Sequence, residues 1–153
     1  MNSAKHSTVL LAEDNSDDIF LMRRAFERAA IPNPLRVVED GVEALDYLQG
    51  IGPYADRAAH PFPCLLLLDV KMPKINGFDV LRRIRDNPAT RRLPVVILTS
   101  SNQQKDIDHA YDLGVNSYLV KPHSAESLEN LLQTLQTYWF SLNNWPQCPP
   151  EQP

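Results

Sequence analysis

The chain has few of the residues that build disulfide frameworks, zinc sites or membrane spans. Its 153 residues include two cysteines and four histidines, and no C-x-x-C pair occurs. Two cysteines are too few for a disulfide framework, and the histidines are too dispersed for a zinc site. No run approaches the roughly 20 apolar residues that cross a bilayer, and the first ten residues lack the apolar core of a signal peptide. We therefore expect a cytoplasmic protein that does not bind membranes.

An excess of positive charge is also missing. The formal net charge is −4, the isoelectric point is near 5.5, and Lys and Arg are scattered along the chain. Nucleic-acid binding requires a clustered basic face, so we expect no nucleic-acid partner. The sequence contains neither G-x-x-x-x-G-K nor G-x-G-x-x-G, which disfavours the nucleotide-binding enzymes that use those loops.

Short apolar runs instead alternate with segments of helical periodicity, a pattern typical of a parallel sheet covered by helices. Their Val, Leu and Ile content fits strands that are buried on both faces. The predicted strands are Thr8–Ala12, Leu35–Val38, Cys64–Leu68, Val95–Leu98 and Ser117–Val120. The first predicted helix begins after Asn15 or Ser16. The other predicted helices span about Val42–Leu48, Phe78–Arg85, Gln104–Leu113 and Ala125–Trp139. The fold class is α/β, a (βα)5 doubly wound parallel sheet.

This unit covers residues 7–140 as one domain. A long connection, Gly50 to Pro63, carries three prolines and two glycines and lies outside the minimal unit. Residues 141–153 form a Pro-rich C-terminal tail, which we expect to be extended or disordered.

Charged and hydroxyl side chains follow four of the apolar runs. Glu13 and Asp14 close the first run, and Asp69 closes the third. Thr99 ends the fourth, and Lys121 ends the fifth. Ligands of open α/β sheets bind at the carboxyl ends of the strands, so these groups are expected to meet there. Three carboxylates, an ammonium and a hydroxyl suit a divalent cation and a phosphoryl group.

Each of these residues also has a structural interpretation. Asp69 alone could cap a helix or form a turn before Pro73, and Thr99 alone could be a β-branched residue that ends a strand. An acidic turn explains Asp17 and Asp18 well. It explains Glu13 and Asp14 less well, because two carboxylates at the end of an apolar strand repel each other unless a cation intervenes.

The motifs VLLAED, LLLLDVKMPKINGFDVL, PVVILTSS and YLVKP resemble those of CheY-like receiver domains, the response regulators of two-component signalling. The resemblance covers about residues 7–140 and implies the strand order 2-1-3-4-5. It implies that Asp69 is the phosphoacceptor. It also implies a Mg²⁺ site formed by Asp14, Asp69 and the backbone carbonyl of Lys71, with Glu13 acting through a bound water. Glu at position 13 replaces the more common Asp.

The same resemblance assigns roles to the remaining groups. Thr99 and Lys121 would stabilise the phosphoryl group. Thr99 and Tyr118 would form the conformational switch, and a cis Lys121–Pro122 bond would aim the lysine inward. The protein would accept phosphoryl groups from a histidine kinase and would be no enzyme beyond its own phosphorylation and dephosphorylation.

Two fainter features point to a subgroup and to self-association. The long Gly50–Pro63 connection and the ending TYWFSL resemble single-domain regulators that are phosphorylated by cyanobacterial phytochrome histidine kinases. The aromatic residues near the end predict a homodimer, with Tyr118, Tyr138, Trp139 and Phe140 as candidate interface residues. The alternative is that the aromatic side chains fold back onto their own domain.

Two other function classes remain open at this point. One is an adaptor on the receiver fold that works without phosphorylation, although every active-site group is present. The other is a small enzyme on a similar fold, such as a flavin protein or a phosphatase. A dehalogenase-type phosphatase requires D-x-D on its nucleophile strand, and the segment Asp69-Val70-Lys71 has no second carboxylate.

Overall fold

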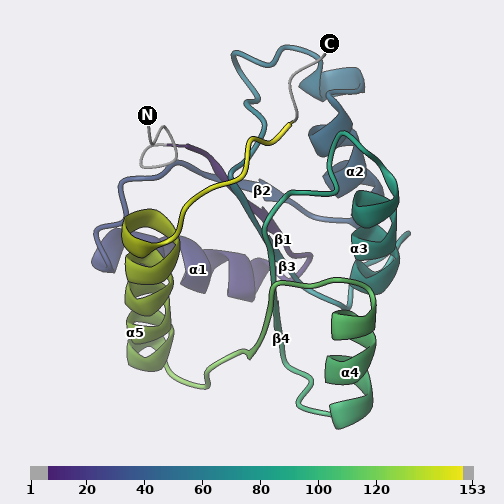
Figure 1. The fold of residues 1–153 in the computed structure, drawn as a ribbon. Coiled ribbons are helices and arrows are strands. Elements are labelled where there is room, and N and C mark those ends of the chain that lie inside the picture. The colour runs from purple at the N-terminus through teal and green to yellow at the C-terminus, as the bar shows by residue number, and fades with distance from the viewer. Residues whose placement is uncertain (1–6, 150–153) are drawn as a thin grey trace.

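The computed structural model describes residues 7–149, which form a five-stranded parallel sheet between two layers of helices (Figure 1). The strands are β1 (Val9–Ala12), β2 (Leu35–Val38), β3 (Leu65–Leu68), β4 (Val95–Thr99) and β5 (Ser117–Val120). The helices are α1 (Ser16–Arg28), α2 (Gly41–Gln49), α3 (Gly77–Asp86), α4 (Gln104–Asp112) and α5 (Ala125–Leu135). The strand order is β2-β1-β3-β4-β5, which confirms the predicted fold class.

The central strands are buried on both faces because helices cover both sides of the sheet. Every residue of β1, β3 and β4 is buried. Alternate residues serve different cores: Leu66 belongs to the core under α2 and α3, while Leu67 belongs to the core under α1 and α5. This two-sided burial explains why the strands read as continuous apolar runs rather than alternating ones.

Polar side chains begin most of the helices at the carboxyl edge of the sheet. Asn15 accepts a hydrogen bond from the backbone N–H of Asp18 at 3.0 Å, and Asn76 accepts one from Asp79 at the same distance. Asp40 and Ser124 cap α2 and α5 in the same way. These caps satisfy backbone donors that lack a partner within the helix. The predicted bounds of α1 to α4 agree with the observed ones to within one or two residues.

The long connection between α2 and β3 packs against the end of α2. The Arg57 guanidinium donates to the carbonyl oxygens of Tyr47 at 2.7 Å and Leu48 at 3.3 Å in the last turn of α2, and the Tyr47 carbonyl also accepts the N–H of Gly50 at 3.2 Å. The guanidinium also lies 5.8 Å from the centre of the Tyr47 ring. Tyr54 and His60 pack their rings against each other in the same cluster. The insertion is therefore an ordered extension of α2.

The end of the chain differs from the prediction. The α-helix stops at Leu135, and a π-helical segment, η3 (Gln136–Leu142), replaces its expected last turn. Its hydrogen bonds span five residues, as in the bond from Asn143 N to Tyr138 O at 2.7 Å. Trp139 and Phe140 are buried, with exposed fractions of 7% and 8%.

Residues beyond η3 fold back over these two aromatic side chains. The Trp145 ring lies 5.7 Å from that of Trp139 and 5.5 Å from that of Phe140. Cys148 packs against the core on the other side of the sheet. Residues 143–147 of the predicted tail have no regular secondary structure, but the partly buried Trp145 packs on Trp139 and Phe140 and holds this segment against the domain. Residues 150–153 of the predicted tail lie outside the described residues.

We predict that Trp145→Ala lowers the free energy of unfolding by about 2 kcal/mol or more, because it uncovers Trp139 and Phe140 and removes a large packed ring. Urea denaturation followed by circular dichroism measures this change. Gln147→Ala, an exposed position in the same segment, is the control and should change stability little. Equal stability of the two variants would contradict the docking of the tail.

Candidate functional site

Four neighbouring strands end together and deliver the polar groups. Ala12 pairs with Leu68, so Glu13 and Asp69, the residues that follow, lie side by side. Thr99, the last residue of β4, pairs with Val120, the last residue of β5, so Lys121 follows β5 directly at the same edge. The backbone N–H of Lys121 donates to the Thr99 carbonyl at 2.7 Å. The parallel register thus brings two acids, a hydroxyl and an ammonium to one edge of the sheet.

The Lys121 ammonium is the centre of this cluster. Nζ lies 2.9 Å from Glu13 Oε2, 2.9 Å from Asp18 Oδ2 and 3.0 Å from Asp69 Oδ2. Burial alone would lower the pKa of Lys121, but the hydrogen bonds to Asp18 and Glu13 and the charge of Asp69 raise it above its usual value. The lysine therefore stays charged and neutralises part of the acidic cluster.

Glu13 and Asp69 share a site where both cannot easily be ionised. Burial, together with a hydrogen bond to Asp69, raises the pKa of Glu13 to about 8. Burial would also raise the pKa of Asp69, but Glu13 and Lys121 hold it below its usual value. Asp69 is consequently the ionised member of the pair and Glu13 the member that holds a proton.

Asp14 completes a group of acids that fits a divalent cation. Asp14 is exposed, whereas Glu13 and Asp69 are buried, and ligand oxygens of all three lie within 4.8 Å of one another. Hard divalent cations prefer such oxygen ligands. The pKa of Glu13 is raised mainly by burial and secondly by its hydrogen bond with Asp69, and a bound cation would favour the ionised form of both acids. The residues present therefore fit a bound cation.

Thr99 and Tyr118, the two predicted switch residues, lie on the neighbouring strands β4 and β5. Thr99 Oγ1 is buried without a hydrogen-bond partner among the described residues, yet it lies near enough to favour the ionised form of Asp69. Tyr118 packs against the core, and its hydroxyl donates to the Ser101 carbonyl at 2.9 Å. Ser101 Oγ in turn donates to Asp106 on α4 at 2.6 Å. The loop after β4 is therefore tied to both β5 and α4.

The loop after β3 is held by a close approach at Gly77. A Cβ atom on this residue would lie 2.2 Å from the Asp69 carbonyl oxygen, and the Gly77 N–H donates to Val70 O at 2.8 Å. Gly77 is thus required because two backbone segments touch. Lys71 is exposed at the start of this loop, and its carbonyl oxygen stays a predicted ligand.

Two features of the site differ from what the sequence suggests. The cis peptide bond among the described residues is Cys148–Pro149, so the Lys121–Pro122 bond is trans and the predicted cis bond is wrong. The trans form is the ordinary preference of an X-Pro bond, and Lys121 reaches all three carboxylates from it. Asp18, expected only to favour the helix N-terminus, is a direct partner of Lys121. Its place one turn after Asp14 on a helix that starts at the site is the signal that could have identified it.

Comparison with known proteins agrees with this geometry. The family model described as "Response regulator receiver domain" matches residues 9–133. The chain belongs to the response regulator receiver domain family. This receiver domain is 38% identical over 138 residues to the probable methanogenesis regulatory protein FilR2 of Methanothrix harundinacea, covering 90% of the chain and 86% of that protein.

Two cyanobacterial response regulators are also similar. Response regulator Rcp1 of Synechocystis sp. is 36% identical over 132 residues, covering 86% of the chain and 88% of Rcp1. The crystal structure of the phosphorylated cyanobacterial phytochrome response regulator RcpA superposes with a TM-score of 0.85 at 37% identity, covering 93% of this chain and 99% of RcpA. The receiver domain is therefore a response regulator of a two-component system.

Metal binding is known for one relative, and membrane spans are not found. The crystal structure of the Mn²⁺-bound form of Rcp1 has a TM-score of 0.81 at 34% identity, covering 92% of this chain and 99% of that one. The acidic cluster around Asp69 is consistent with a divalent cation in this receiver as well. Over residues 7–149, the helices are all too short or too polar to cross a bilayer.

The raised pKa of Glu13 predicts how the metal-free protein responds to pH. A carboxyl whose folded pKa exceeds its unfolded pKa contributes stability that is complete below about 4.5 and is lost as pH rises through about 8. Glu13→Gln cannot ionise. Its free energy of unfolding, relative to that of the parent, should therefore rise by a few kcal/mol as the pH increases from about 4.5 to about 8. Urea titrations in a chelator from pH 5 to 9 measure the difference. Glu27→Gln, an exposed control on α1, should show no such trend, and a flat difference for Glu13→Gln would contradict the buried acid pair.

Proposed function

We propose that Asp69 accepts a phosphoryl group from a histidine kinase and that the phosphorylated receiver changes its partner binding or its dimerisation. The observation that carries this proposal is the ammonium of Lys121, which contacts both Glu13 and Asp69 beside a buried Thr99 hydroxyl that has no partner. An ionised nucleophile, a counter-charge and an available donor are the groups that phosphoryl transfer requires. The protein catalyses only its own phosphorylation and dephosphorylation.

The contacts suggest a role for each oxygen of Asp69. Lys121 engages Oδ2, so Oδ1 is the nucleophile. The Oδ1–P bond forms as the N–P bond of the phosphohistidine donor breaks, and the leaving imidazole nitrogen keeps the electron pair and takes up a proton. Lys121 and the Thr99 hydroxyl then donate to the new phosphoryl oxygens, which draws Thr99 toward Asp69.

We propose Mg²⁺ as the cofactor. Asp14, Asp69 and the backbone carbonyl of Lys71 would hold it, with Glu13 acting through a bound water. When bound, the ion neutralises charge on the acids and the phosphoryl oxygens. Burial raises the pKa of Glu13 in the metal-free protein, and the charge of the bound ion would favour its ionised form.

The kinase partner is proposed to be a phytochrome-type sensor kinase in the cytoplasm, because RcpA, to which the receiver is similar, is a phytochrome response regulator. The structure offers a docking surface beside the site. Phe20 and Leu21 on α1 are 59% and 42% exposed, and Leu21 borders a small cavity that also reaches Lys121. A helix that carries the donor histidine could pack on this apolar surface.

Asp69→Asn should abolish phosphorylation and leave the fold intact, because the amide keeps the shape but lacks the anionic nucleophile. Stability should stay unchanged or rise, since one of the clustered charges is removed. Intact mass after incubation with acetyl phosphate and Mg²⁺ measures the added phosphoryl group. Asp79→Asn, at a half-exposed acid paired with Arg82, is the control and should be phosphorylated normally. Phosphorylation of the Asp69 variant at the parent rate would refute the assignment of Asp69 as the phosphoacceptor. That result would support neither an adaptor that works without phosphorylation nor a switch operated at Asp69.

Removal of the acids should weaken Mg²⁺ binding in a graded way. Glu13→Ala should cost about tenfold in affinity, as loss of an outer-shell partner does, and Asp14→Ala should cost more because it contacts the ion directly. Isothermal titration with Mg²⁺ gives both values. Asp17→Ala, an exposed acid three residues beyond Asp14, should bind like the parent. Undiminished affinity in Asp14→Ala would show that the ligand set is wrong.

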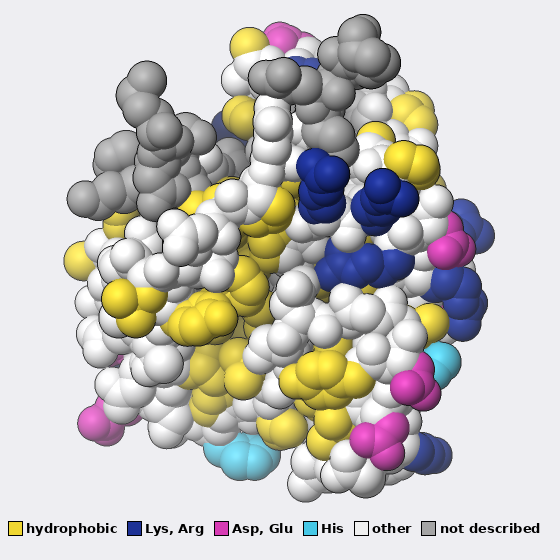
Figure 2. All heavy atoms as spheres, in the orientation of Figure 1, with side chains coloured by type: hydrophobic (Ala, Val, Ile, Leu, Met, Phe, Trp, Pro, Cys, Tyr) yellow, Lys and Arg dark blue, Asp and Glu magenta, His cyan; other side chains and the backbone are white. Residues whose placement is uncertain are grey.

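A homodimer is also proposed, on a revised set of residues. Trp139 and Phe140 are buried in their own domain, so they cannot anchor a partner as the sequence suggested. Tyr138 stays 53% exposed, and Tyr111 on α4 and Val120 on β5 are 52% and 40% exposed. Figure 2 shows hydrophobic side chains gathered over α4, β5 and α5 on this face. A symmetric pairing of this face would lie next to Tyr118 and couple assembly to phosphorylation.

Tyr111→Ser combined with Tyr138→Ser should weaken the dimer by tenfold or more without unfolding the protein, because both side chains are exposed. Sedimentation equilibrium, with and without acetyl phosphate and Mg²⁺, measures the association constant. Ile51→Ser is the matched control, since Ile51 is 48% exposed in the connection that follows α2. A parent protein that remains monomeric at high concentration, with and without phosphorylation, would contradict the proposed homodimer.

A further inference from the structure

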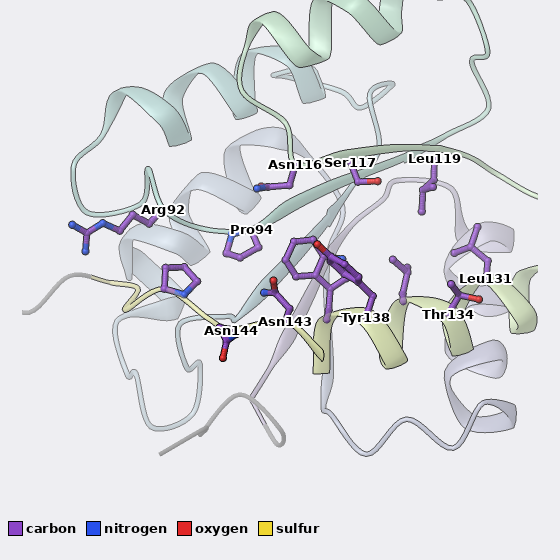
Figure 3. A pocket seen from close by; sticks show the side chains of 13 residues that line it. Arg92, Pro94, Asn116, Ser117, Leu119, Leu131, Thr134, Tyr138, Asn143 and Asn144 are labelled. Atoms are coloured by element: carbon purple, nitrogen blue, oxygen red, sulfur yellow. The ribbon is translucent and has the colours of Figure 1, made fainter. Parts of the chain in front are cut away.

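Two cavities border α5, and their walls differ in charge. The larger, of about 740 Å³, lies where Leu119 of β5 faces Leu131 of α5 (Figure 3), and its lining contains no acid. The smaller, of about 50 Å³, lies between α1 and α5, and its lining includes both Asp18 and Lys121 among apolar side chains. The ion pair of these two residues is therefore bordered by an apolar cavity, which screens it less than open water would.

The Lys121 ammonium has no donor to spare. It carries three N–H groups. Its Nζ lies 2.9 Å from Glu13 Oε2, 2.9 Å from Asp18 Oδ2 and 3.0 Å from Asp69 Oδ2. Under the proposed function, Glu13 and Asp69 also serve the cation, and Asp69 carries the phosphoryl group. Asp18 has neither task, because the acids whose oxygens lie within 4.8 Å of one another are Glu13, Asp14 and Asp69.

The helix cap fixes the backbone of Asp18. The Asn15 side chain accepts a hydrogen bond from the Asp18 N–H at 3.0 Å, and the Ile19 N–H donates to the Asn15 carbonyl at 3.0 Å. Glu13 Oε1 accepts the Asn15 N–H at 3.2 Å, so the cap is tied to the acid cluster. These contacts determine where the Asp18 carboxylate meets Lys121.

We propose that Asp18 is a positioning residue for phosphoryl transfer. It holds the Lys121 ammonium at the site while Glu13 and Asp69 serve the cation and the phosphoryl group, and it makes no contact with the phosphoryl group itself. Lys121 requires such a hold because its long side chain loses conformational freedom when it is kept in one place. This inference rests on the proposed function, since it assumes phosphorylation of Asp69.

The alternative is that Asp18 only stabilises the start of α1, and Asp17 separates the two roles. Asp17 stands in the same first turn of α1, is exposed, and forms no salt bridge within residues 7–149. Both acids complement the helix dipole, whereas the contact with Lys121 belongs to Asp18. Asp17 is therefore the matched control.

The test compares Asp18→Asn with Asp17→Asn in the full chain. Acetyl phosphate with saturating Mg²⁺ is the phosphodonor: the Asp69 Oδ1–P bond forms as the bridging O–P bond breaks, and acetate leaves with that electron pair. Intact mass follows the phosphorylated fraction with time. Asp18→Asn should slow phosphorylation about tenfold, because an amide replaces a charged acceptor of Lys121. Asp17→Asn should match the parent, and Asp18→Glu, which keeps the charge, should recover part of the rate.

Two further measurements separate positioning from loss of the metal site or of the fold. Isothermal titration should show nearly the parent Mg²⁺ affinity in Asp18→Asn, since Asp18 lies outside the group of acids that fits the ion. In the metal-free protein, nitrogen-15 NMR should show faster exchange of the Lys121 ammonium protons with water in Asp18→Asn than in Asp17→Asn. Urea unfolding midpoints show that each variant is folded.

The inference is overturned if Asp18→Asn is phosphorylated as fast as the parent, or if Asp17→Asn slows the reaction as much. Faster phosphorylation of Asp18→Asn would also overturn it, because Asp18 would then withhold Lys121 from the phosphoryl group. A loss of rate matched by an equal loss of Mg²⁺ affinity would assign Asp18 to the metal site instead. A parent protein that acetyl phosphate does not phosphorylate at Asp69 would overturn the proposed function, and this inference with it.

Discussion

One ammonium group holds the functional edge of the sheet together. Lys121 contacts Glu13, Asp18 and Asp69, which come from three different parts of the chain. Two of these acids are buried, and buried carboxylates without a counter-charge are strongly destabilising. The sheet register puts Glu13 and Asp69 side by side, and Lys121 makes that arrangement tolerable. The lowered pKa of Asp69, which keeps this carboxylate ionised, follows from its contacts with Glu13 and Lys121.

The strands and the central acids were predictable because their signals are local. Continuous apolar runs mark strands covered on both faces, and the residue after each run must lie at the carboxyl edge. This rule places Glu13, Asp69, Thr99 and Lys121 without knowledge of any contact. The part played by Asp18 was less accessible, because it depends on the angle at which α1 leaves β1. The need for Gly77 likewise comes from two backbone segments that touch, which residue type alone does not reveal.

The end of the chain was the least predictable region, for a physical reason. Proline-rich composition argues against regular structure but says nothing about whether aromatic side chains can reach a core. The π-helical segment allows Trp139 and Phe140 to be buried, and Trp145 then covers both. The predicted cis Lys121–Pro122 bond failed for a related reason. Isomer choice depends on the packing around the bond, and the trans form already lets the lysine reach the acids.

The aromatic stack at the end of the chain gives the protein an intrinsic fluorescent probe. Both tryptophans of the sequence, Trp139 and Trp145, lie in this stack, with ring centres 5.7 Å apart and planes tilted by 37°. Indole emission therefore observes one place, at the end of the chain. A change in indole emission when Asp69 is modified would require a structural change that is transmitted along the sheet. Native fluorescence thus separates long-range transmission from local chemistry without any label.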